Sequence, residues 1–338
     1  MAKRAGVSGS TASIAFSGEG SISASTRERV LKAAEELNYA GPDPRARSLR
    51  QGRSGIVGVI LEDRVLNSFR DPMMIAALDG ISQELGESGG MLLLTSNGED
   101  ESTIQTAVFD AAIFMGCSPH LARSIEIMRQ RNVPMVAIEG QKFEGVLSIV
   151  LDNHEASATM ARLVHDLGHR RVATITLPLD WHRELRPLTA EIVDNATTAT
   201  SLDRLEGARE VFADLGGFVA ANSSSDEGFA AAVQLLDAAP GRRPTAIIAQ
   251  SDLLAVGAIR AAESLGLRVG RDVTVVGFDG ARIEGMSDYD LTTMVQPATE
   301  KGRAAGFAVT ELLAGREAAD ESFTSRLHVG NTSGPAPQ

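Results

Sequence analysis

Cysteine is nearly absent from this sequence of 338 residues, which contains Cys117 alone. A single cysteine cannot form an intramolecular disulfide, so we expect a fold without a covalent framework that is compatible with a reducing compartment. Long apolar runs are missing too. No window approaches the roughly eighteen apolar residues of a membrane-spanning helix, and the N-terminus lacks the apolar core of a signal peptide. These absences argue against a membrane or secreted protein and predict a cytoplasmic one.

Recognisable enzyme motifs are absent as well. The sequence has no Walker A loop, no H-E-x-x-H and no G-x-S-x-G, and the glycines around Gly277 lack the dinucleotide-binding spacing. His165 and His169 have the spacing of a helical metal pair, but Gly168 between them is typical of a helix C-terminus. Cys117 follows the apolar run Ala111–Met115 without a paired His or Cys and is expected to be buried and inert. We therefore expect no catalytic residue, no metal site and no cofactor.

Charge is distributed unevenly along the chain. The net charge is −12, yet residues 1–53 contain nine Lys and Arg against five Asp and Glu, a balance of +4. The remainder therefore carries −16. A basic head on an acidic body is expected where only the head binds a polyanion. The alternative is that a short segment reaches +4 by chance.

From Gly55 onward, short apolar runs alternate with helical patterns. The first series of predicted strands covers Ile56–Leu61, Met91–Thr95, Ala111–Met115, Pro134–Ile138 and Val146–Leu151. A second series covers Val172–Leu177, Phe218–Ala221, Ala246–Ala249 and Val273–Phe278. Helices are predicted over Asp71–Leu85 and from starts near His154, Asp203, Asp226 and Asp252. This alternation predicts an α/β fold with two doubly wound parallel-sheet lobes.

The last elements predict that the chain crosses back between the lobes. A helix is expected over Ala298–Leu313 and a strand near Arg326–Val329. We assign residues 55–151 and 296–316 to an N-terminal lobe, and residues 152–295 and 317–332 to a C-terminal lobe. The polar tail from Gly330 to Gln338, with its glycines and two prolines, is expected to fray.

The first 54 residues predict a small helical module and a linker. A capping box at Ser25-Thr26-Arg27-Glu28 predicts the start of a helix with one apolar face. Before it, Gly6-Val7-Ser8 is a turn signal, and Ser10–Phe16 fits a short helix. After it come two prolines and the basic stretch Arg45-Ala46-Arg47-Ser48-Leu49-Arg50. We predict an all-α helix-turn-helix DNA-binding module over residues 1–42 and a hinge helix or linker over residues 43–54.

Several ordered motifs resemble the lactose-repressor (LacI/GalR) family of bacterial transcription regulators. They are Ala5–Ser8, Ser10–Ser13, Thr26–Leu31, Asp43–Leu49, Asp152-Asn153, Leu167–Val172, Ser251–Gly257 and Asp272–Asp279. The resemblance covers nearly all of the chain. It implies periplasmic-binding-protein-like lobes and a homodimeric repressor that a small molecule, expected to be a sugar, releases from double-stranded operator DNA.

The resemblance also places the base-reading positions of a major-groove helix. They fall on Gly9, Ser10, Thr11, Ser13 and Ile14. The family commonly has a basic residue where Ile14 stands, and an isoleucine can touch a thymine methyl but cannot donate to guanine. The alternative for Ile14 is a core contact with the capped helix.

The first helix is short compared with the family. Only four residues precede Ala5-Gly6, whereas the family has a longer helix there. We expect that the start site is misplaced. The alternative is an impaired DNA-binding module.

The family's hinge residues map onto the basic stretch. Leu49 corresponds to an apolar wedge in the minor groove, and Arg45, Arg47 and Arg50 would neutralise phosphates on either side. The alternative for Leu49 is an ordinary anchor in a linker. Such a hinge is expected to fold only on DNA.

Doubly wound lobes bind ligands at the carboxyl ends of their strands. This rule selects Glu62, Asp63 and the loop through Phe69 on the first lobe, and Trp181 on the second. A solvated loop for the two acids, and a core or interface position for the tryptophan, are the alternatives.

The resemblance assigns effector contacts to Arg204 and Asp279, and it marks Ser251, where the family often has an amide. An arginine and a carboxylate in one cavity suit a hydroxyl-rich ligand. A binding protein with the same two lobes but without DNA is the other function class that fits. A periplasmic carrier, however, would need a signal peptide and would have no use for the basic stretch Arg45–Arg50.

Overall fold

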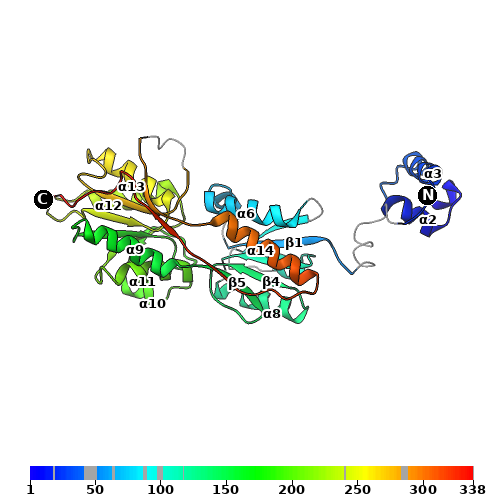
Figure 1. Ribbon diagram of the computed structural model, residues 1–338, viewed down its shortest axis with the longest axis horizontal. Coiled ribbons are helices and arrows are strands. Elements are labelled where there is room, and N and C mark those ends of the chain that lie inside the picture. Colours follow the sequence, from blue (N-terminus) through cyan, green and yellow to red (C-terminus); the bar gives the residue numbers. More distant parts are fainter. Residues whose placement is uncertain are drawn as a thin grey trace. The chain divides into compact units, whose positions relative to one another are not determined.

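The computed structural model describes residues 1–17, 20–41, 52–62, 65–86, 90–96, 102–116, 118–239, 241–282 and 288–337. The chain forms two compact units, Met1–Gly55 and Ile56–Gln338 (Figure 1). Some residues singled out from the sequence lie outside the described residues: Arg45, Arg47, Leu49, Arg50, Asp63 and Cys117. Among the helices of the described part, none has the length and apolarity needed to cross a membrane.

The described residues of the first unit form three helices, α1 (Ala2–Ala5), α2 (Gly9–Ser17) and α3 (Ala24–Glu36). Gly6 connects the first two because its left-handed backbone, with φ of 66°, suits a residue without Cβ. The buried core is built from small residues and one valine: Ala5, Ala12, Ala15, Ala33 and Val30. Small side chains let the three helices pack closely around this short core.

The helix α3 begins two residues earlier than the predicted capping box implies. The Ser23 hydroxyl, not that of Ser25, accepts from the Thr26 N–H at 3.2 Å. Ser23 has the extended backbone of an N-cap, whereas Ser25 already lies inside the helix. Ile22, the residue before the cap, packs against the core. This contact favours Ser23 over Ser25 as the N-cap.

The first lobe of the second unit is built on a six-stranded sheet in the order β12-β5-β4-β3-β1-β2, in which every pair is parallel. Its strands are β1 (Ile56–Leu61), β2 (Gly90–Thr95), β3 (Ala111–Met115), β4 (Met135–Ile138), β5 (Val146–Leu151) and β12 (Glu321–Phe323). Its helices are α5 (Val65–Ser68), α6 (Pro72–Leu85), α7 (Ser102–Thr106), η1 (Pro119–Leu121), α8 (Ala122–Gln130) and α14 (Ala298–Leu313). Apolar residues of α6 and α14 cover one face of the sheet, and those of α7 and α8 cover the other.

The second lobe has seven strands in the order β13-β11-β10-β9-β6-β8-β7, parallel except at its two edges. They are β6 (Val172–Thr176), β7 (Arg186–Pro187), β8 (Gly216–Val219), β9 (Ala246–Ala249), β10 (Thr274–Asp279), β11 (Thr292–Val295) and β13 (Arg326–His328). The helices are α9 (Asn153–Asp166), α10 (Ala190–Asp194), α11 (Ala199–Arg209), α12 (Ser225–Leu236) and α13 (Asp252–Ser264). The two predicted series of strands and the doubly wound fold class are thereby confirmed.

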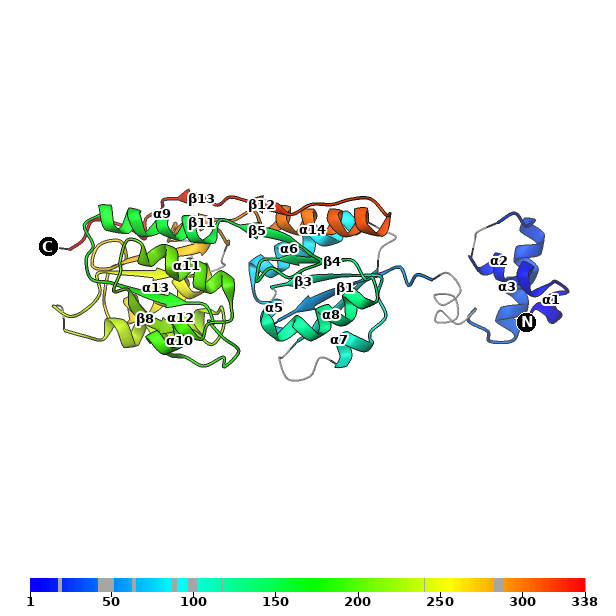
Figure 2. The ribbon, with the colours of Figure 1, turned by 90° about the horizontal axis from the view of Figure 1, so that it is seen from below.

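The chain passes between the lobes three times, at β5 to α9, at β11 to α14 and at β12 to β13. Figure 2 shows these elements along one edge of the unit. The short strand β12 pairs with β5 of the first lobe, so the predicted assignment of residues 317–332 to the second lobe is wrong for Glu321–Phe323. Its three residues, Glu321–Phe323, are too few and too polar to signal a strand.

The C-terminal tail is not frayed, contrary to our prediction. Thr332 is fully buried, and its hydroxyl accepts from the Thr292 N–H at 3.0 Å. The buried ring of His169 lies 3.0 Å from the Gly334 carbonyl oxygen and 2.9 Å from the Thr245 hydroxyl. The tail is ordered because it satisfies polar groups along β10 and β11. His169 is a structural residue that holds it there.

Candidate functional site

Glu62 follows β1 at the carboxyl end of the first sheet. Its carboxylate accepts from the Ser118 hydroxyl at 2.5 Å. Its backbone carbonyl accepts from the guanidinium of Arg183, a residue of the second lobe, at 2.8 Å. The structure thus places Glu62 where the two lobes meet.

Trp181 lies at the same junction. Its ring stacks on that of His182 with 4.5 Å between centroids, and it stands edge-on to His120 of the first lobe at 6.4 Å. The side chain is 48% exposed, so it is not a core residue. Phe69 is 54% exposed. We call the contacts of Trp181 and Arg183 with His120 and Glu62 the rim contact.

Arg204 is deeply buried on α11, with 4% of its surface exposed. Its Nε donates to Asn153 Oδ1 at 2.8 Å, and another guanidinium nitrogen donates to the Gln250 carbonyl at 2.6 Å. The guanidinium also lies over the Phe278 ring at 3.6 Å. Gly207, one turn along, lets α11 approach α9, because a Cβ there would stand 2.0 Å from the His154 carbonyl oxygen. The predicted R-x-x-G pattern therefore positions this arginine.

Asp279 ends β10 and faces Arg204. The two charged groups are 3.8 Å apart, and Gln296 Nε2 donates to the carboxylate at 2.6 Å. Burial raises the pKa of Asp279 well above the usual carboxyl range, although Arg204 opposes the rise. Arginine and aspartate, predicted as a pair, are thus brought together inside the junction.

A second buried carboxyl, Asp252, lies nearby at the start of α13. It accepts from the Thr293 hydroxyl at 2.6 Å and from the Ala281 N–H at 2.7 Å. Burial raises its pKa to about 7, against the effect of these donors and of Arg204. Ser251, predicted as an effector contact, is the N-cap of α13 and accepts from the Leu254 N–H at 3.2 Å. Its observed role is therefore to cap the helix.

Four residues at this junction were missed by the sequence analysis: Glu139, Asn153, Gln296 and Lys301. Lys301 Nζ donates to Glu139 Oε1 at 2.5 Å and to Gln296 Oε1 at 2.6 Å. The other oxygen of Glu139 accepts from Asn153 Nδ2 at 2.7 Å. Together with Arg204 and Asp279 these side chains form a closed circuit of hydrogen bonds and ion pairs, which we call the junction ring. Two signals were available: Asn153 stands in the family-like motif Asp152-Asn153, and Lys301 lies among the small residues of an otherwise apolar helix face.

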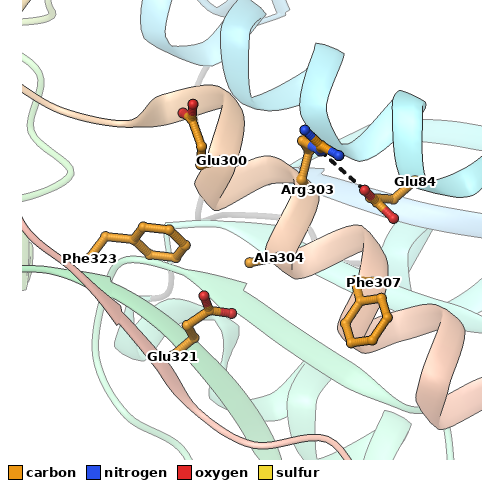
Figure 3. A pocket seen from close by; sticks show the side chains of 7 residues that line it. All are labelled: Glu84, Glu300, Arg303, Ala304, Phe307, Glu321 and Phe323. Atoms are coloured by element: carbon orange, nitrogen blue, oxygen red, sulfur yellow. Dashed lines mark hydrogen bonds and ion pairs between the residues drawn. The ribbon is translucent and has the colours of Figure 1, made fainter.

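A shallow hollow of about 260 Å³ opens elsewhere on the first lobe. Figure 3 shows it between α6, α14 and β12, with Arg303 directed at Glu84. Its lining residues are Glu84, Glu300, Arg303, Ala304, Phe307, Glu321 and Phe323. The hollow contains no side chain of the junction ring and was not anticipated from the sequence.

The predicted base-reading positions lie on α2 of the first unit. Gly9 and Ser10 are exposed, and Thr11, Ser13 and Ile14 are half-buried. Ser8 caps the helix by accepting from the Thr11 N–H at 3.1 Å. Ile14 lies beside Gly20, where an added Cβ would stand 3.2 Å from the isoleucine side chain. Ala12 and Ala15 supply the contacts with the core.

Comparisons with known proteins agree with this architecture. A family model for bacterial regulatory proteins of the LacI family matches residues 1–41, and one for a periplasmic binding protein-like domain matches residues 161–333. A helix-turn-helix unit ahead of a two-lobed α/β unit defines a class of transcription regulators.

Relatives over the full length specify the family. The HTH-type transcriptional regulator IpsA of Corynebacterium glutamicum is 31% identical and aligns over 99% of this chain and 96% of its own. A solved LacI-family regulator from the same species is 26% identical, with a TM-score of 0.75 and coverage of 98% and 97%. The Lac repressor dimer bound to operator shares the fold at 24% identity, with a TM-score of 0.73 and the same coverage. The chain belongs to the LacI family and is a transcriptional regulator.

Proposed function

We propose that this protein is a homodimeric, cytoplasmic repressor that binds operator DNA through its helical unit and is released by a small sugar-like effector. The observation that carries the effector part is the buried Arg204–Asp279 pair at the carboxyl end of β10. A solved relative of the same fold, at 24% identity and a TM-score of 0.68, is a CelR–cellobiose complex. No catalytic chemistry is needed for this function.

The charges around Arg204 favour a neutral, hydroxyl-rich ligand. Burial lowers the pKa of Arg204, and four carboxylates act against that effect: Asp279, Glu139, Asp71 and Asp252. Glu139 and Asp71 would repel an anionic ligand, while Asp279 and Asp252, whose pKa values burial raises, offer oxygens to hydroxyl donors. Hydroxyl groups, in contrast, can donate to carboxylates and accept from a guanidinium. Glu62 and Trp181 at the rim contact supply a further acceptor and an aromatic face.

The DNA part of the proposal assigns base contacts to Gly9, Ser10, Thr11, Ser13 and Ile14. Their exposed or half-buried placement on α2 supports this assignment. The phosphate contacts of Arg45, Arg47 and Arg50 and the wedge role of Leu49 follow the family pattern. A homodimer fits because one short helix reads too few bases to select a site alone.

A fluorescence-anisotropy titration with duplexes from the promoter of the protein's own gene tests the DNA part. We expect salt-dependent binding that exceeds binding to random duplex. Leu49→Ala should reduce specific binding and leave nonspecific binding nearly intact, because an apolar residue releases no counterion. Arg47→Ala should reduce both and lower the salt slope by about one.

A thermal-shift screen of sugars tests the effector part. The sugar that stabilises the protein should release it from the duplex. If the protein bound no duplex better than random DNA and Leu49→Ala had no effect, a two-lobed sensor without DNA would replace the repressor.

A further inference from the structure

The junction ring joins the two lobes through side chains that come from every part of the hinge. Glu139 and Lys301 belong to the first lobe, and Arg204 and Asp279 belong to the second. Asn153 and Gln296 lie on two of the three segments that cross between the lobes. Each crossing residue therefore connects a charged group of one lobe to a charged group of the other.

The third crossing is tied to the first by the residue next to Asn153. Asp152 accepts from both the backbone N–H and the hydroxyl of Ser325, at 2.8 and 2.7 Å. Its own N–H donates to the Phe323 carbonyl at 3.1 Å. Asp152 therefore connects the first and third crossing segments, and the junction ring connects the first to the second.

Burial makes the ring sensitive to the loss of any one member. The charged side chains of Lys301, Glu139, Arg204 and Asp279 are 5%, 15%, 4% and 10% exposed. A buried charge is tolerated only while its partners are in place, and removing one partner leaves the other uncompensated. A ligand that draws Asp279 or Arg204 into new bonds therefore alters the bonds of Gln296, Asn153 and the lysine beyond them.

Lys301 lies on a helix that cannot move alone. The next residue, Gly302, contacts α6 so closely that an added Cβ would stand 2.0 Å from the Ala77 carbonyl oxygen. Gly80 of α6 meets the Thr299 carbonyl oxygen of α14 in the same way, at 2.1 Å. Figures 1 and 2 show α6 and α14 side by side. A displacement of Lys301 is therefore shared by both helices.

We propose that the junction ring is a hinge switch, in which Lys301 is a positioning residue that couples the Arg204–Asp279 pair to the first lobe. In the arrangement described, the ring is closed and the rim contact is made. An effector that exchanges bonds with Arg204 or Asp279 opens the ring and lets the lobes rearrange. This last step depends on the proposed function, whereas control of the lobes by the ring requires neither DNA nor effector.

The intrinsic fluorescence of the full chain tests this proposal, because Trp181 is the sole tryptophan and reports the rim contact. Lys301→Met should shift the emission to longer wavelength and increase quenching by acrylamide. Arg303→Met is the matched control, since Arg303 lies on the same helix in an exposed pair with Glu84 (Figure 3). This control should leave emission and quenching as in the wild type.

A folded Lys301→Met protein, shown by circular dichroism, with unchanged emission and quenching would overturn the proposal. If this variant does not fold, the double variant Lys301→Met/Glu139→Gln decides, because it leaves no unpaired carboxylate beside the methionine. If the double variant folds, the proposed pairing of Lys301 with Glu139 in the junction ring is supported. If it also fails to fold, the proposal is contradicted. These measurements use no ligand. The effector proposal fails separately, if no sugar in the screen alters duplex binding.

Discussion

The two lobes meet at two places that differ in burial and chemistry. At the hinge, the junction ring buries four charged groups and satisfies them with one another and with two amides. At the rim contact, an exposed arginine donates to a backbone carbonyl, and a half-exposed tryptophan rests on histidines. Breaking a hydrogen bond at the hinge costs more free energy, because water cannot replace the lost partner there. At the rim contact water can replace it, so the cost is small. We infer that the rim opens readily while the hinge sets the arrangement.

The largest expected effect comes from removing Arg204, one of the two cations of the junction ring. Arg204→Met leaves the Asn153 side-chain oxygen and the Gln250 carbonyl without a donor and Asp279 without its cation in a buried site, so the free energy of unfolding should fall by about 3–5 kcal/mol. Urea denaturation followed by circular dichroism measures it. Arg209→Met on the same helix, which loses one bond to the Leu215 carbonyl, should cost about 1 kcal/mol. Equal losses of unfolding free energy in Arg204→Met and Arg209→Met would show that the junction ring is no more sensitive than the rest of α11.

A smaller effect concerns the pH dependence of stability. The pKa of Asp252 rises from 3.8 to about 7 on folding, so the folded state holds a proton that the unfolded state has released. Its contribution to stability is full below the unfolded value and is lost as the pH rises toward 7. Asp252→Asn should therefore flatten the decline of the unfolding free energy between pH 4 and about 7.

Asp226→Asn is the control for this titration. Asp226 lies at the start of α12 with 94% of its side chain exposed, so its replacement should keep the wild-type slope. The measurement is the urea midpoint at several pH values. A slope that is identical in wild type and Asp252→Asn would show that this carboxyl does not titrate in the folded state as its burial requires.

The smallest effect is expected at the rim. Arg183→Ala removes an exposed bond to the Glu62 carbonyl and should lower the unfolding free energy by less than about 1 kcal/mol, while acrylamide quenching of Trp181 increases. Arg170→Ala, which loses bonds to the His165 and His169 carbonyls within the second lobe, should leave quenching unchanged. If Arg183→Ala lowered the free energy of unfolding as much as Arg204→Met does, the rim contact would not be the weaker of the two places where the lobes meet.

The sequence predicted the framework well because strands of parallel sheets are continuous apolar runs with local signals. Ala111–Met115, for example, has the same bounds in sequence and structure. The family-like motifs also singled out Arg204 and Asp279, which the structure places 3.8 Å apart; their contact with an effector stays a prediction. The prediction failed where order depends on distant partners. The tail after Gly330 has the composition of a frayed end, yet its bonds go to strands about 40 and 60 residues away.

The ring could not be predicted from its members one at a time. Lys301 and Glu139 are separated by 162 residues along the chain; Glu139 alone resembles a solvated charge on a loop, and Lys301 on its apolar helix face does not indicate its partner. Only the crossing of the chain at Asn153 and Gln296 brings them together. Periodicity identifies the face of a helix but carries no information on which remote carboxylate a buried lysine will meet.

The most direct test of this account is a double-mutant cycle between Lys301 and Arg204 in the full chain. In the described structure these residues lie on different lobes and are joined through Glu139 and Asn153 on one side and through Gln296 and Asp279 on the other. Free energies of unfolding would be measured for Lys301→Met, Arg204→Met and the double variant. The account predicts a coupling energy of about 1 kcal/mol or more, since either substitution alone already opens the ring. Additive losses, within about 0.3–0.5 kcal/mol, would show that the lobes are not coupled through the ring.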